Sequence, residues 1–144
     1  AFRVVQLIRN HRREIVDRAI RQIREEPELR RLQALPSSDL AGLAQAVIQD
    51  LESGTELEEV SRRYELRGRR AWAESVPMHE YVRGLQLLHY ALVDFARTQA
   101  VPRTPVEIYS QEDLEERLCH IFDRIAYHFI RGYELGQAAG RPAA

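Results

Sequence analysis

Few side chains in this sequence have the types and spacing that enzyme chemistry requires. The sequence lacks a glycine-rich phosphate loop, a Cys-x-x-Cys pair, a His-Glu-x-x-His zinc motif and a nucleophile elbow. The single cysteine, Cys119, is expected within a helix at the border of its apolar face, and the adjacent His120 would point elsewhere. A nucleophilic thiol needs a neighbouring base and an electropositive setting. We therefore predict no catalytic residues and no enzymatic activity.

The same predicted helix carries three side chains of types that bind metals. Glu116, His120 and Asp123 share one of its faces and have the side chains that could hold a metal weakly. A carboxylate-bridged centre in a helical bundle would need two Glu-x-x-His units, and the sequence has none. Because Arg117 and Arg124 lie nearby, a salt-bridge cluster accounts better for these residues, and we predict no metal site.

Four side chains near the inner faces of predicted helices combine apolar bulk with a polar group: Trp72, His89, His128 and Tyr133. If the protein senses a small molecule, we expect these residues to bind it between the third, fourth and fifth predicted helices. A core built only for packing has little use for them, because each buried polar atom needs a partner. The structural alternative is that Trp72 and His89 lie at the edges of apolar faces, where water satisfies their polar atoms.

The composition is that of a globular protein with little attraction for nucleic acids or membranes. The 144 residues carry a net charge of −1, and all 21 basic residues are Arg. The length predicts one domain with a core that needs no disulfide, and a single cysteine allows no internal one. No apolar run is long enough to cross a membrane. We expect a cytoplasmic protein that binds neither nucleic acid nor membranes.

Apolar periodicity predicts an all-α domain of about five helices with globin-like or bundle-like packing. The first helix is expected at residues 2–26 and the second from Ser38 or Asp39 to about Leu51. The third would start with a capping box at 55–58, and the last with a cap at Ser110. Residues 1–136 would form the domain, and 137–144 a flexible tail or the start of a linker.

The third and fourth predicted helices meet at a break with a clear physical cause. Pro77 disfavours helical backbone angles at Val76, yet its own fixed φ suits the first position of a new helix. Before the break, the small residues Gly68 and Ala71 would let another helix approach closely.

The stretch around this break resembles the N-terminal domain of the RsbT co-antagonist (RsbR) proteins. The motif is an aromatic residue, Leu-x-Gly-Arg-Arg, Val-Pro, Glu-Tyr-Val-Arg-x-Leu-x-Leu-Leu and Ala-Leu-x-Asp-Phe. It consists here of Tyr64, Leu66, Gly68, Arg69, Arg70, Val76, Pro77, Glu80, Tyr81, Val82, Arg83, Leu85, Leu87, Leu88, Ala91, Leu92, Asp94 and Phe95. The resemblance implies a globin-like, usually dimeric input domain, placed ahead of a signalling output domain and without catalytic residues.

The function predicted from this resemblance is that of a regulatory sensor domain in a bacterial signalling protein. The parent protein would be a stressosome protein of the RsbR type or a histidine kinase, and the signal would pass down the C-terminal helix to the output domain. One alternative is a globin-type sensor of haem or another small ligand, with His89 or His128 as the haem ligand. The other is a purely structural dimerisation module.

Three residues are predicted at the interface of a homodimer. Leu87 and Tyr90 form a second apolar strip on the outward side of the fourth helix, and such a strip often marks an interface. Arg12 interrupts the inner stripe of the first helix. It either extends an apolar stem with its charge in water, or pairs across a subunit interface or with an anionic ligand.

Overall fold

The computed structural model describes residues 2–53, 57–99 and 101–140, which contain seven α-helices and no strand. The all-α prediction is confirmed. The helices are α1 (Phe2–Asn10), α2 (Arg12–Glu25), α3 (Arg30–Gln33), α4 (Ser37–Ser53), α5 (Leu57–Ala73), α6 (Met78–Gln99) and α7 (Pro105–Ala139). None of the helices in these ranges is both long and apolar enough to cross a membrane.

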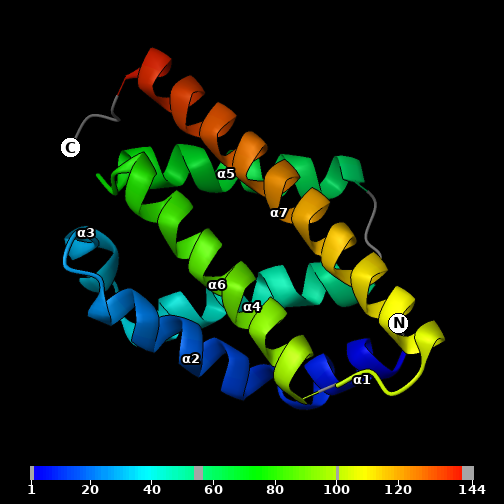
Figure 1. The fold of residues 1–144 in the computed structure, drawn as a ribbon. Helices are drawn as coiled ribbons and strands as arrows, with labels where there is room; N and C mark the ends of the chain where they lie inside the picture. Colours follow the sequence, from blue (N-terminus) through cyan, green and yellow to red (C-terminus); the bar gives the residue numbers. More distant parts are fainter. Residues whose placement is uncertain (1, 54–56, 100, 141–144) are drawn as a thin grey trace.

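Helix α6 lies at the centre of the fold. It packs against α2 on one flank and α7 on the other, while α5 crosses behind α7 (Figure 1). Helix α4 packs on α2. The largest hydrophobic cluster draws residues from α1, α2, α4, α5, α6 and α7, so the central core joins all the long helices.

The first predicted helix is divided in two. Residues 2–26 were expected to be continuous, but α1 ends at Asn10 and α2 begins at Arg12. His11 lies between them with φ −113° and ψ 20°, outside the helical region. Its ring lies 5.4 Å from that of Phe95 near the end of α6. The bend lets α1 and α2 both pack against α6.

Helix α7 begins earlier than expected, at Pro105 instead of after Ser110. Thr104 is its N-cap: the Thr104 Oγ1 accepts a hydrogen bond of 3.2 Å from the Glu107 backbone N–H. The Glu107 carboxylate accepts one of 2.6 Å from the Arg103 N–H. Thr-Pro-x-Glu is a start signal in its own right, because Pro suits the first helical position and Glu the third.

Helix α7 ends within the segment predicted to be a flexible tail or the start of a linker. The helix continues to Ala139, past the boundary predicted at residue 136. A Cβ built on Gly136 would lie 3.1 Å from the Trp72 ring, so this turn is packed against α5. Residues 141–144 of the predicted tail, and 54–56 of the predicted capping box, lie outside the described residues.

The break between α5 and α6 is confirmed. Ser75 adopts a left-handed conformation with φ 62°. The Ser75 N–H donates to the Trp72 carbonyl and the Val76 N–H to the Ala71 carbonyl, which together form a Schellman motif. Val76 and Ala71 are both buried in one apolar cluster, so the break is part of the core.

Helices α5 and α7 approach each other backbone to backbone. A Cβ built on Gly68 would lie 2.1 Å from the Phe129 carbonyl oxygen, and one on Gly132 would lie 2.0 Å from the Glu65 carbonyl oxygen. No other residue type fits at either position without separating the helices. The close approach expected at Gly68 is confirmed.

Candidate ligand cleft between helices α4, α5 and α6

Two of the four predicted ligand-binding residues meet at the crossing of α5 and α7. The rings of Trp72 and Tyr133 contact edge to face with centroids 5.6 Å apart. The buried Tyr133 hydroxyl donates a hydrogen bond of 2.9 Å to the Val76 carbonyl. Tyr133 therefore links α7 to the break before α6, and its polar atom is already partnered within the protein.

The two histidines lie elsewhere, so the four residues do not form one site. His89 stacks on Phe122 with ring centroids 4.7 Å apart, and its Nε2 lies 3.8 Å from Cys119 Sγ. Burial lowers the pKa of His89, and the charge of Asp123 partly opposes this effect. His128 faces α5, with its Nδ1 3.7 Å from the Glu65 carboxylate. The four residues lie apart because α7 presents different faces to α5 and α6, and their role in ligand binding stays a prediction.

The geometry also bears on the haem alternative. An apolar cavity of about 50 Å³ lies between α2, α4 and α6, and neither His89 nor His128 lines it. Ligand sites usually enclose roughly 300–1,000 Å³. Within the described residues, the two histidines that were candidates for haem ligation thus contact Phe122, Cys119 and Glu65 and do not border this cavity.

A larger cleft lies where the first turns of α4 face the last turns of α5 and the start of α6. Its volume is about 400 Å³. It is lined by Leu35, Ser38, Asp39, Gly42, Leu43, Arg67, Arg70, Ala71, Glu74, Val76 and Tyr81. Ala71 and Val76 are buried, whereas Asp39, Arg70 and Glu74 are exposed. The cleft therefore has an apolar floor and a charged rim.

Arg67 is the half-buried cation of this cleft. Its guanidinium lies 5.7 Å from the centre of the Tyr64 ring, a cation–π distance. Arg67 also lies close to the Tyr81 hydroxyl. Burial raises the pKa of Tyr81, and the positive charge of Arg67 partly offsets that rise. In the part of the chain that the structure describes, no carboxylate lies within ion-pair distance of Arg67.

The ring beneath Arg67 is fixed by a network that joins α4 to α5. The Tyr64 side chain is buried, and its hydroxyl donates 3.1 Å to Asp50, whose other oxygen accepts 2.6 Å from Arg63. Burial raises the pKa of Tyr64, with the negative charge of Asp50 as the next cause. The phenol therefore stays neutral and keeps donating to Asp50.

The sequence offered a signal for Arg67 that the prediction missed. Arg67 follows the buried Tyr64 by three residues and precedes the buried Ala71 by four, so it borders the inner face of α5. Neither Arg67 nor Arg70 was among the predicted ligand-binding residues. The cleft combines donors with an apolar floor but pairs no nucleophile with a base, so its arrangement suits binding.

The residues predicted at an interface have different environments. Leu87 is 6% exposed and packs with Leu29 and Leu32. The prediction that it lies in an outward apolar strip is therefore wrong, because α3 covers that side of α6. Arg12 donates 3.1 Å to Glu52 on α4, within the same chain. Tyr90 is 53% exposed.

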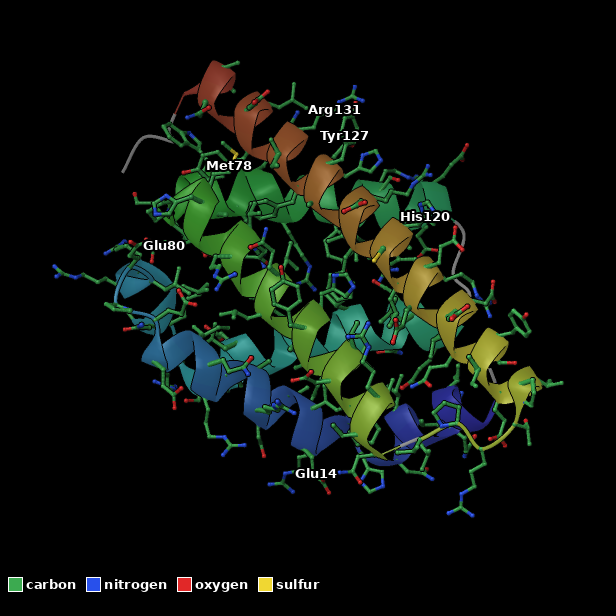
Figure 2. The ribbon with its side chains drawn as sticks, in the orientation of Figure 1. Glu14, Met78, Glu80, His120, Tyr127 and Arg131 are labelled. Atoms are coloured by element: carbon green, nitrogen blue, oxygen red, sulfur yellow. The ribbon has the colours of Figure 1, made fainter. Side chains whose placement is uncertain are left out.

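Comparison with models of protein families, with characterised proteins and with solved structures finds no match for this chain. The resemblance of residues 64–95 to RsbR proteins therefore stays a prediction. Several residues of that stretch have a defined structural role here. Glu80, for example, is buried where α6 meets α3 (Figure 2) and accepts hydrogen bonds from the Arg31 and Leu32 backbone N–H groups.

Proposed function

We propose that this chain is a non-catalytic input domain of a cytoplasmic bacterial signalling protein, of the RsbR or histidine-kinase type. It binds a small molecule in the cleft between α4, α5 and α6 and passes the resulting movement to α7. An output domain of the parent protein receives the signal from α7. The resemblance of residues 64–95 and the all-α fold support this assignment.

One observation carries the signalling part of the proposal. The wall of the cleft that holds Arg67 and Arg70 belongs to α5, and α5 touches α7 through the Gly68–Gly132 crossing. Backbone atoms in contact leave no side chain that can yield between the two helices. A ligand that changes the spacing of α5 from α4 therefore moves α7 as well.

The length of α7 extends such a movement over the whole molecule. The helix has 35 residues, or roughly 50 Å at 1.5 Å per residue. It packs on α5 with its C-terminal half and also contacts α6. A small shift at the crossing therefore reaches both of its ends.

We also propose that the domain acts as a homodimer. The start of α7 exposes Val106, Ile108 and Tyr109, with Val101 just before the helix. Val106 and Tyr109 lie one turn apart, and each is 73% exposed. Exposed apolar groups at this density favour association with a second copy.

A cross-link across the cleft tests the signalling proposal. Gly42→Cys on α4 and Arg70→Cys on α5 place one thiol on each wall, and Cys119→Ser removes the native exposed thiol. A short bismaleimide then joins the walls. We expect the backbone amide resonances at both ends of α7, residues 106–113 and 135–139, to shift on cross-linking.

The matched control is the same protein with both thiols capped by N-ethylmaleimide. It carries the same substitutions and similar adducts but leaves the walls free to move. Shifts confined to residues of α4 and α5 near the two cysteines would overturn the signalling proposal.

A further inference from the structure

We infer that the cleft between α4, α5 and α6 is a carboxylate site, whose ligand is a small monocarboxylic acid with an apolar chain. This inference rests on the proposed function, because it names the ligand class of the same cleft. Arg67 and Tyr81 bind the carboxylate, and the buried floor receives the chain.

Arg67 differs in its partners from other arginines that link helices. Arg12, Arg63 and Arg83 each donate to a carboxylate on, or next to, another helix: Glu52, Asp50 and Glu26. Arg67 is half-buried and among the described residues contacts two aromatic side chains instead. A partly desolvated guanidinium favours an anionic partner, and its planar fork matches a carboxylate.

Arg67 and Tyr81 together supply hydrogen-bond donors to the cleft. Arg67 and Tyr81 both line the cleft and both carry donors, since the guanidinium has only donors and the phenol has one O–H. The Tyr81 O–H can therefore donate to an anion that Arg67 holds in the cleft. The Tyr81 ring stacks on Phe129 with centroids 4.0 Å apart, which holds it in place. A carboxylate bound at Arg67 would accept hydrogen bonds from both side chains.

The apolar lining, the volume and the rim charges of the cleft indicate the size and charge of the rest of the ligand. Leu35, Leu43, Ala71 and Val76 supply apolar surface beside Arg67. The cleft volume of about 400 Å³ lies within the usual range for small-molecule sites. The rim carries two carboxylates, Asp39 and Glu74, and one cation, Arg70, so a ligand with one negative charge fits better than a phosphate or a dicarboxylate.

The test uses hexanoate as the probe, with amide resonances of the intact chain as the readout. We expect hexanoate to shift resonances of Arg67, Ala71 and Tyr81, with hexan-1-ol and inorganic phosphate each binding at least tenfold more weakly. Equal binding of hexan-1-ol would overturn the inference, because the carboxylate would then be unrecognised. Tighter binding of phosphate would overturn it as well.

Variants locate the interaction. Arg67→Gln should weaken hexanoate binding at least tenfold, Arg67→Lys less, and Tyr81→Phe severalfold. Arg69→Gln is the matched control, because Arg69 is exposed on the same helix and does not line the cleft. Binding unchanged in a folded Arg67→Gln protein, checked by circular dichroism, would also overturn the assignment.

The two proposals fail separately. If hexanoate binds at Arg67 and the ends of α7 do not respond, the carboxylate site stands and the signalling proposal falls. If α7 responds to the cross-link and hexanoate does not bind, the signalling proposal stands and the carboxylate site falls.

Discussion

His89 has the environment of a structural residue, although its position suggested a ligand. Its ring is half-buried between α6 and α7, stacked on Phe122. Burial lowers its pKa, with only partial compensation from Asp123. The neutral imidazole therefore packs as an aromatic ring, and the protonated imidazolium is less stable in this half-buried position.

The lowered pKa has a consequence for stability in acid. Because the folded state binds the His89 proton less readily than the unfolded chain, this contribution is present above the unfolded pKa of about 6.5 and is lost as pH falls. We expect His89→Leu to be as stable as the wild type or more so at neutral pH, and to lose less stability on acidification. Urea unfolding at several pH values measures this. His120→Leu is the control, since His120 is exposed on the surface of α7, and an identical pH slope for wild type and His89→Leu would contradict the prediction.

At the scale of helices, the crossing of α5 and α7 governs the architecture. Gly68 and Gly132 remove the side chains that would hold the two helices apart. The same crossing brings Trp72 against Gly136 and Tyr133. The contact is backbone to backbone, so a side chain added there cannot be accommodated by a rotamer change.

Gly68→Ala tests this crossing. The added Cβ would lie 2.1 Å from the Phe129 oxygen, so the helices must separate, at a cost of about 1–3 kcal/mol in unfolding free energy. Gly42→Ala on α4 is the matched control, because a Cβ there meets nothing within 4 Å. That variant should gain about 0.5–1 kcal/mol, since Ala is the better helix former. Thermal and urea unfolding measure both, and an unchanged Gly68→Ala midpoint would exclude close contact.

At the scale of the whole molecule, the exposed start of α7 is where we expect two copies of the chain to associate. The apolar side chains at the start of α7 lie at the opposite end of the helix from the α5 crossing. An interface there would place two copies of α7 in contact where a movement of the helix changes how they meet. Dimerisation and signalling would then be linked through one helix.

Sedimentation at tens of micromolar should show a dimer for the wild type. Val106→Arg combined with Tyr109→Arg should convert it to monomer, because two charges cannot be buried without partners at an apolar interface. Tyr127→Arg is the control: Tyr127 is 61% exposed and lies on the side of α7 away from α6 (Figure 2). A wild-type protein that sediments only as monomer would contradict the prediction, and a dimer retained in the double variant would place the interface elsewhere, with Tyr90 the next residue to replace.

Much of the fold was determined locally, and the sequence alone therefore predicted it. The apolar periodicity of α4, α5 and α6 and the break at Pro77 depend on residues within a few positions of one another. Backbone stereochemistry and side-chain size act at that range. The absence of a side chain at Gly68 marked a point where another helix could approach, but the helix that does so, α7, lies far along the sequence. The start of α7 was also encoded locally, in Thr104, Pro105 and Glu107, but the prediction chose the later signal at Ser110.

The sites were decided by tertiary structure. On an isolated helix Leu87 belongs to the outward face, and it is buried only because α3 packs there. Arg12 meets Glu52, and Glu80 meets α3, across 40 or more residues of sequence. The cleft exists because α5 is held by α7 while its last turns face α4, which brings Arg67 and Tyr81 together. Helical periodicity predicts which face a residue occupies, but only the packing of the helices determines what that face meets.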